Sequence, residues 1–116
     1  MTREFVRLFE FEKQCKQLGL DDDDIADIEG ELLDNPAIGV VIQGTGGIRK
    51  MRIKLPAKGK SGGARVVYVD FVSFEKIYLL TAYGKTVKQD ITQSEKKELK
   101  KLVNCLESEL RKKGSK

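Results

Sequence analysis

The chain contains no histidine and no tryptophan, and it has only two cysteines. The absence of histidine excludes a Ser-His-Asp or Cys-His catalytic site and a ribonuclease site built on two histidines. It also excludes a zinc site with a histidine ligand, and two cysteines are too few for an all-cysteine zinc site. Cys15 and Cys105 do not form a C-x-x-C pair, so we expect free thiols in a reducing compartment or core residues.

Long hydrophobic runs are also missing. No apolar run approaches the roughly 18 residues that would span a membrane. The start of the chain, MTREFVRLFEFEKQ, lacks the apolar segment and cleavage site of a signal peptide. We therefore expect a cytoplasmic protein with no membrane partner. The length of 116 residues, with 40% hydrophobic and 34% charged residues, predicts one globular domain over residues 1–116.

Acidic residues are missing from one long stretch of the chain. Residues 42–68 hold seven Lys and Arg and no Asp or Glu, whereas residues 1–34 hold 11 acids against 4 bases. The remaining residues, 35–116, hold 7 acids against 18 bases, so the net charge of +4 understates the positive field at this end. Such asymmetry predicts a polyanionic partner for the basic part of the chain.

The spacing of apolar residues predicts an α+β fold. Helical and strand periods alternate along the chain, and a small antiparallel sheet of three or four strands is expected to pack against N-terminal helices and a C-terminal helix. We expect these helices to cover one face of the sheet. The expected elements are a strand within 3–9, helices at 9–18 and 21–35, strands at 48–55, 64–71 and 76–83, and a helix that begins at the TQSE capping box, where Thr92 and Glu95 lie three residues apart.

Two short motifs have structural interpretations that we favour over chemical ones. The aspartates at 21–24 are placed to cap the helix that follows them, because helix N-termini carry unpaired N–H groups and a positive dipole. A metal site would need ligands spaced around a loop. GTGG, residues 44–47, lacks the spacing and the strand–helix context of a P-loop, so it is interpreted as a turn into a strand.

The segment IRKMRIKL, residues 48–55, alternates between apolar and basic residues. A strand directs successive side chains to opposite faces, so Lys50, Arg52 and Lys54 share one face, about 7 Å apart along the strand. This separation is similar to that of phosphates along an extended single strand of nucleic acid. The alternative is a solvated sheet face whose lysines prevent aggregation.

Three blocks of this sequence resemble the RelE/HigB group of toxins from toxin–antitoxin systems. The blocks are GTGGIRKMRIK, KGKSGGARVVYV and YLLTAYGK, and a capped C-terminal helix follows them. The resemblance implies a small α+β protein that binds the ribosomal A site and cuts mRNA during translation. It also implies an antitoxin partner, here expected to be a HigA-like helix-turn-helix protein, with operator DNA bound only through the antitoxin complex.

The resemblance also implies roles for individual residues. Arg52 and Lys54 match the basic pair of the family's Lys-x-Lys strand, and Arg65 matches the arginine that contacts the scissile phosphate. Lys85 matches the lysine of the family's Gly-Lys segment, and Tyr83 lies just before it. The further cations expected to hold RNA are Arg49, Lys50, Lys58 and Lys60.

Two positions depart from RelE and match the HigB-like branch. RelE has an arginine where this chain has Thr86, and a tyrosine where it has Thr92. These departures leave open which group moves protons. Cleavage by the RNA's own 2′-OH needs alignment, proton transfer and charge stabilisation, and no cofactor or metal ion. Lys54 is the base candidate, because neighbouring cations favour a neutral amine.

Some alternatives stay open at this stage. Tyr83 could stack on a base, donate a proton or pack in the core. Period 2 places Arg65 on the face of two core-like valines, so its strand is either frayed at the start or buried on both faces. The whole protein could be a non-catalytic nucleic-acid- or antitoxin-binding module, or a ParE-like gyrase inhibitor. The R-x-K strand and Arg65 favour an endoribonuclease over the gyrase inhibitor.

Overall fold

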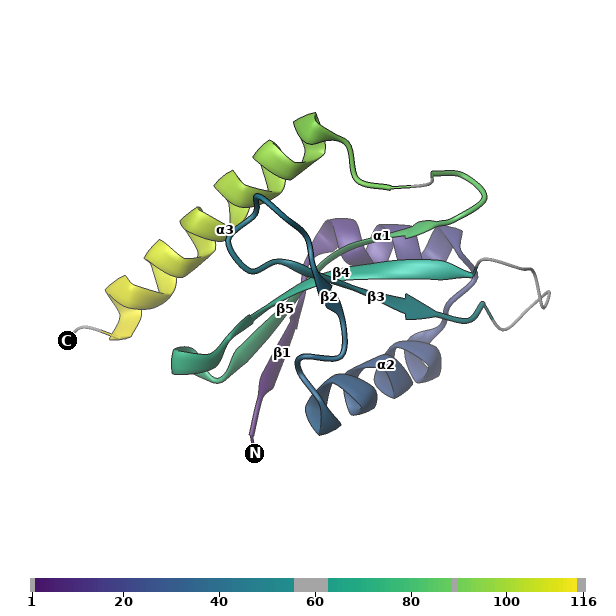
Figure 1. Ribbon diagram of the computed structural model, residues 1–116. Helices are drawn as coiled ribbons and strands as arrows, with labels where there is room; N and C mark the ends of the chain where they lie inside the picture. Colours follow the sequence, from purple (N-terminus) through teal and green to yellow (C-terminus); the bar gives the residue numbers. More distant parts are fainter. Residues whose placement is uncertain (1, 56–62, 89, 115–116) are drawn as a thin grey trace.

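The computed structural model describes residues 2–55, 63–88 and 90–114. Within these residues, helices occur at both ends of the chain and most strands lie between them (Figure 1). The elements are β1 (Glu4–Arg7), α1 (Phe9–Gln17), α2 (Asp22–Asp34), β2 (Val40–Val41), β3 (Arg49–Ile53), β4 (Ala64–Phe71), the 3-10 turn η1 (Val72–Phe74), β5 (Lys76–Gly84) and α3 (Gln93–Gly114).

The five strands form one sheet in the order β1-β5-β4-β3-β2. β1 pairs with β5 in parallel, and the other neighbours are antiparallel. The α+β class predicted from the sequence is therefore confirmed. The sheet is larger than the expected three or four strands and is mixed, because the opening strand joins the far edge beside β5 before the chain turns into α1.

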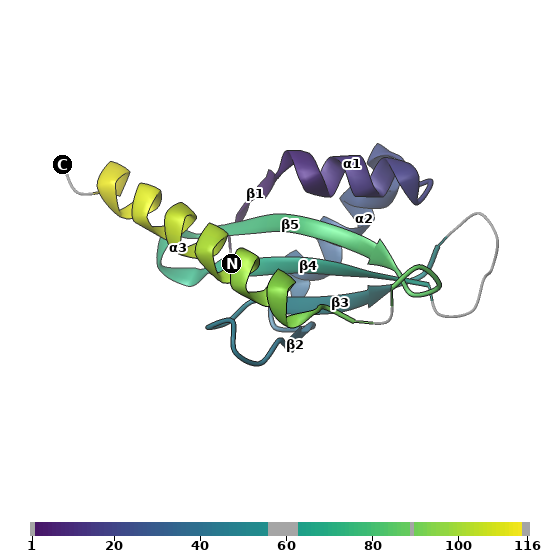
Figure 2. The same ribbon diagram turned by 90° about the horizontal axis from the view of Figure 1, so that it is seen from above.

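The helices lie on both faces of the sheet, with α1 and α2 on one side and α3 on the other (Figure 2). The expectation that they cover a single face was wrong. The reason is the composition of β4, in which four consecutive residues, Val66 to Val69, are all buried. A strand that is apolar on both faces needs a layer on each side, and α3 supplies the second layer.

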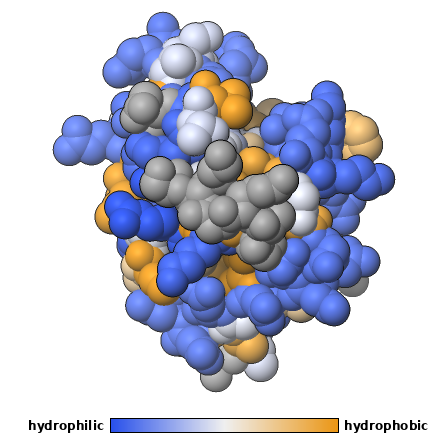
Figure 3. Space-filling model, turned by 90° about the vertical axis from the view of Figure 1, so that its right-hand side faces the viewer, coloured by the Kyte–Doolittle hydropathy of each residue, from blue (hydrophilic) through white to orange (hydrophobic). Residues whose placement is uncertain are grey.

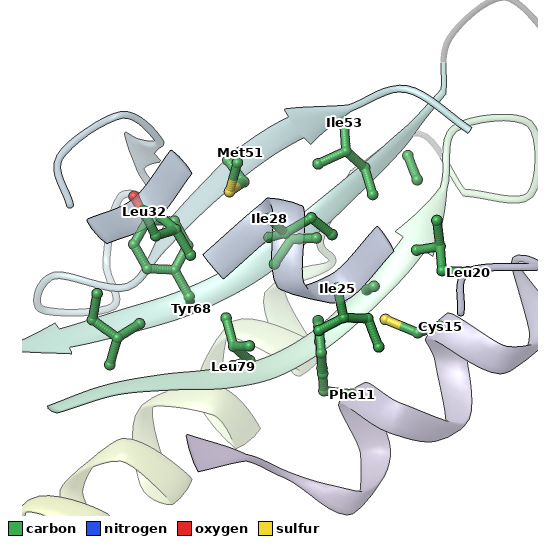
Figure 4. Close-up of a cluster of buried hydrophobic side chains, with 14 residues drawn as sticks. Phe11, Cys15, Leu20, Ile25, Ile28, Leu32, Met51, Ile53, Tyr68 and Leu79 are labelled. Carbon is green, nitrogen blue, oxygen red and sulfur yellow. The ribbon is translucent and has the colours of Figure 1, made fainter. Parts of the chain in front are cut away.

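The larger core lies between the sheet and the two N-terminal helices (Figure 4). Phe11 and Cys15 of α1 and Ile28 of α2 pack with Met51 of β3 and Leu79 of β5. Met51 therefore lies on the face opposite Lys50 and Arg52, as the alternation predicted. The aspartates that precede α2 form its capping box, in which the Asp21 and Asp24 carboxylates accept each other's backbone N–H, at 2.9 Å each.

The second core lies under α3, where Val103 and Leu110 pack with Val67 and Val69 of β4 and neighbouring residues. The capping box predicted at the start of this helix is present. Glu95 N donates to the Thr92 hydroxyl at 3.1 Å, and Thr92 N donates to the Glu95 carboxylate at 2.9 Å. No helix of the described residues is both long and apolar enough to cross a lipid bilayer.

The segment that precedes β3 is fixed to the sheet by Tyr68, whose side chain is fully buried. The Tyr68 hydroxyl donates to Pro36 O at 2.8 Å and accepts from Gly39 N at 2.9 Å. Further along, GTGG forms the predicted turn. The Thr45 hydroxyl donates to Ile42 O at 2.6 Å and accepts a hydrogen bond at 3.2 Å from Ile48 N, just before β3.

Candidate nucleic-acid interface

The strand register brings three of the predicted site residues into one row. Arg52 of β3 lies opposite Arg65 of β4, and Arg65 lies opposite Tyr83 of β5. Residues directly opposite on antiparallel strands project to the same face, with Cβ atoms about 5 Å apart. The row therefore crosses three neighbouring strands on the face that α3 covers further along.

Two more predicted residues lie beside this row, at the same end of the sheet. Lys54 follows β3 and is exposed, as Arg52 is, whereas Lys85 follows β5 and is half-buried. Lys85 N donates to Gly63 O at 3.1 Å, which ties the residue after β5 to the residue before β4. Figure 3 views the molecule from this end, where hydrophilic side chains dominate the described surface, with apolar patches between them.

The position of Arg65 resolves the conflict in the sequence pattern. Arg65 shares a strand face with Val67 and Val69, which are buried under α3. Arg65 itself is the second residue of β4, beyond the cover of the helix, and is half-buried. The second possibility left open by the sequence is therefore confirmed, because β4 is buried on both faces. Its start is not frayed, since Arg65 is paired with Arg52 on one side and Tyr83 on the other.

Arg49 does not join the row. It has the same parity along β3 as buried Met51, so it projects to the opposite face. Its guanidinium donates to Gly39 O at 2.6 Å, which gives it a structural role in holding the segment before β2. Lys58 and Lys60, also predicted to hold RNA, lie outside the described residues.

Lys50 lies on the cationic face and is engaged by an acid that the sequence analysis did not select. Its ammonium contacts the Asp90 carboxylate at 2.8 Å. The hydrogen bond from Lys50, followed by one from Ile91 N, lowers the pKa of Asp90 below its usual value. Asp90 lies 40 residues away along the chain. It belongs to the segment between β5 and α3, and the path of that segment brings it to Lys50.

Tyr83 is buried at the inner end of the row. The residue is 6% exposed, and its hydroxyl has no hydrogen-bond partner among the described residues. Burial raises the pKa of this phenol above its ordinary value. The Lys88 ammonium lies 5.3 Å from the ring centroid and forms an ion pair with Glu95. A ring covered in this way is not available to stack on a base in this conformation.

An apolar cleft of about 650 Å³ lies between α1, β5, the segment after β5 and α3. Leu8, Leu18 and Val87 contribute to its lining, and Glu10 and Glu98 supply acidic groups. No local sequence pattern indicates this cleft, because its apolar residues come from four separated segments. Its acids make it unsuited to a phosphate chain, so the cationic row is the better candidate for contact with nucleic acid. Among the described residues, no group of three or more Cys, Asp or Glu could hold a metal ion.

The fold and the row define a class of protein. Its members are small α+β proteins with helices on both faces of the sheet and arginines aligned on neighbouring strands. The family model described as "RelE toxin of RelE / RelB toxin-antitoxin system" matches residues 7–113. The chain therefore belongs to the RelE toxin family, as the three sequence blocks predicted.

A solved structure supports this membership at the level of the fold. The free state of E. coli toxin RelE, in a mutant with two arginines replaced by alanine, matches with a TM-score of 0.52 and 16% sequence identity. The match covers 77% of this chain and 90% of that chain. At this identity the likeness concerns the fold alone.

Proposed function

We propose that this protein is a toxin that inhibits translation by cutting mRNA on the ribosome, and that it belongs to the HigB-like branch of its family. The alignment of Arg52 with Arg65 on neighbouring strands is the observation that supports this most strongly. Two guanidinium groups on one face can contact one phosphate or two successive phosphates, and arginine stays protonated at every physiological pH.

The proposed reaction is attack of the RNA 2′-OH on the adjacent phosphate, which forms a 2′,3′-cyclic phosphate and breaks the bond to the 5′-oxygen of the next nucleotide. The leaving 5′-oxygen takes a proton from solvent. Arg65 holds the scissile phosphate and stabilises the charge that grows on it in the transition state. Arg52 and Lys85 hold the chain on either side, and Lys54, which is exposed beside Arg52, accepts the proton of the 2′-OH. Each of these groups belongs to the protein, so the proposed reaction uses no cofactor and no metal ion.

Tyr83 supports this site through packing in our proposal. Its hydroxyl is buried and its ring is covered by the Lys88 ammonium, so neither is placed to contact RNA in this structure. Its position opposite Arg65 instead gives the arginine a rigid neighbour on the central strands. Of the three roles considered for Tyr83, the proposed one is therefore packing, and not base stacking or proton donation.

The partners in this proposal are the ribosome with its mRNA and a cognate antitoxin of the HigA-like helix-turn-helix type. Operator DNA is contacted only through the toxin–antitoxin complex. The protein acts in the cytoplasm, where translating ribosomes are found. Two other functions remain as outcomes of the test: a non-catalytic binding module that uses the same cations, and a ParE-like inhibitor of gyrase.

Induced expression without antitoxin, followed by mapping of mRNA 5′ ends, tests the proposal. The wild type should arrest growth and create new 5′ ends inside translated regions. Arg65→Ala should abolish both effects, and Arg65→Lys should restore them only in part, because lysine lacks the planar fork that binds phosphate. Lys101→Ala is the matched control, since Lys101 is an exposed cation on α3.

The alternatives give different results in the same experiment. A binding module would leave growth and mRNA 5′ ends unchanged. A gyrase inhibitor would arrest growth and induce DNA damage without new 5′ ends in mRNA. Either result would overturn the proposed mRNA cleavage.

A further inference from the structure

The cations on the α3 face of the sheet fall into two groups. Arg52 and Lys54, at the outer end of β3, are exposed. Lys50 and Lys88, near Tyr83, are each engaged by a carboxylate from the segment that leads into α3. Lys50 pairs with Asp90 and Lys88 pairs with Glu95. Lys50 and Lys88 are thus each paired with a carboxylate in the free protein. Arg52 and Lys54 are exposed and line a hollow with acidic residues of α2, among them Asp27.

The Asp90 carboxylate of the Lys50–Asp90 pair is also held by the protein backbone. Asp90 accepts a second hydrogen bond, from Ile91 N at 2.8 Å, and Ile91 is itself buried against the sheet. The carboxylate is therefore aimed at β3 by the backbone that starts the approach to α3. The lowered pKa of Asp90 means that it stays ionised across the physiological range.

This pair lies within reach of solvent. The Asp90 side chain is 65% exposed and the Lys50 side chain is 24% exposed. Lys50 would therefore be accessible to a phosphate if the Asp90 carboxylate were removed. Lys50 precedes Arg52 by two residues on the same face of β3. It therefore extends the line of cations from the row toward the middle of the sheet.

We propose that Asp90 sets the inner limit of the RNA path by occupying Lys50, so that RNA is held on the outer cations and excluded from the inner end of the face. This inference rests on the proposed function, because it concerns the same face. Asp90 acts here through Lys50, as a residue that positions the RNA without contacting it. The expected consequence is that removal of the Asp90 charge lengthens the binding site by one phosphate contact.

Asp90→Asn isolates the charge, because asparagine keeps an oxygen that can accept the hydrogen bond from Ile91 N. Asp34→Asn is the matched control, since Asp34 is an exposed acid at the end of α2, on the opposite face, and gives the same change in net charge. Binding is measured by fluorescence anisotropy with single-stranded 2′-O-methyl oligouridylate, which cannot be cleaved because its 2′ oxygen is blocked. Asp90→Ser is a second variant that also retains an acceptor.

Asp90→Asn should bind this RNA up to about fivefold more tightly at low salt, which corresponds to the release of an exposed ion pair. The slope of log affinity against log salt should steepen by about 0.7, the increment for one phosphate on a single strand. The gain should vanish when Lys50→Ala is present in the same chain. An equal gain in Asp34→Asn, or a gain that persists without Lys50, would overturn the inference.

The same titration separates this inference from the proposed function. Wild-type binding that depends on salt and is weakened by Arg52→Ala supports RNA contact at the row, whatever Asp90→Asn does. If Asp90→Asn then shows no gain, only the role of Asp90 fails. Wild-type protein that does not bind the RNA, with Asp90→Asn equally inactive, would overturn the role of Asp90, and mRNA cleavage on the ribosome would then be decided by the mapping of 5′ ends.

Discussion

Replacement of Tyr83 by phenylalanine separates the packing of this residue from its chemistry. The Tyr83 hydroxyl is buried and has no partner among the described residues, so its removal breaks no hydrogen bond described in the structure. A buried hydroxyl without a partner destabilises a protein by about 1 kcal/mol or more. Tyr83→Phe should therefore leave the free energy of unfolding unchanged or raise it by about 1 kcal/mol.

The effect on pH dependence follows from the raised pKa of Tyr83. Its pKa in the folded chain lies above the ordinary value of 10.0. The unfolded phenol therefore loses its proton first as the pH rises, and stability is lost above pH 10. Tyr83→Phe should lose less stability than the wild type above this pH. Urea denaturation at neutral and alkaline pH measures both differences.

Activity decides whether the hydroxyl takes part in the reaction. If Tyr83 acts through packing, Tyr83→Phe should cleave mRNA within about threefold of the wild-type rate. General acid catalysis contributes about 10²- to 10⁴-fold. A loss of about a hundredfold in a folded Tyr83→Phe protein would therefore refute the packing role and assign proton transfer to this hydroxyl.

Further predictions concern the supports of the site and the thiols. Tyr68→Phe should lower the free energy of unfolding by about 1–3 kcal/mol in urea denaturation, because Gly39 N–H loses its buried acceptor; half-buried Tyr78 provides a control substitution to phenylalanine. Unchanged stability would show that another group satisfies Gly39. Burial raises the pKa of Cys15 to about 11, whereas Cys105 is exposed. Iodoacetamide at pH 8 should add one group, to Cys105, by mass spectrometry, and two adducts on the native protein would contradict the burial.

The strands of the basic hairpin could be predicted closely because their alternation is regular. The predicted strand at 64–71 has the observed bounds of β4, and Lys50 and Arg52 project to the face opposite Met51, as expected. It was harder to predict whether helices pack on one face of the sheet or on both. Consecutive buried residues in β4 are compatible with several architectures, and the sequence could not show that α3 packs on the second face.

The arrangement of the site depends on contacts between distant segments. Arg52, Arg65 and Tyr83 were all selected from the sequence, but their alignment depends on strand register. That register includes a shift between Val67 and Tyr68, which no local pattern indicates. Asp90 was missed for a similar reason, since an acid among lysines before a helix gives no sign that it reaches a strand 40 residues away.

The central claim is that the arginines aligned across β3 and β4 act on mRNA during translation. Purified protein, incubated with ribosomes stalled on a defined mRNA, tests it most directly, with cleavage followed by primer extension. Wild type and Lys101→Ala should cut the mRNA in the ribosome-bound complex, and Arg52→Ala and Arg65→Ala should each reduce the rate at least a hundredfold. Equal cleavage by all four proteins, or none by the wild type, would contradict this account.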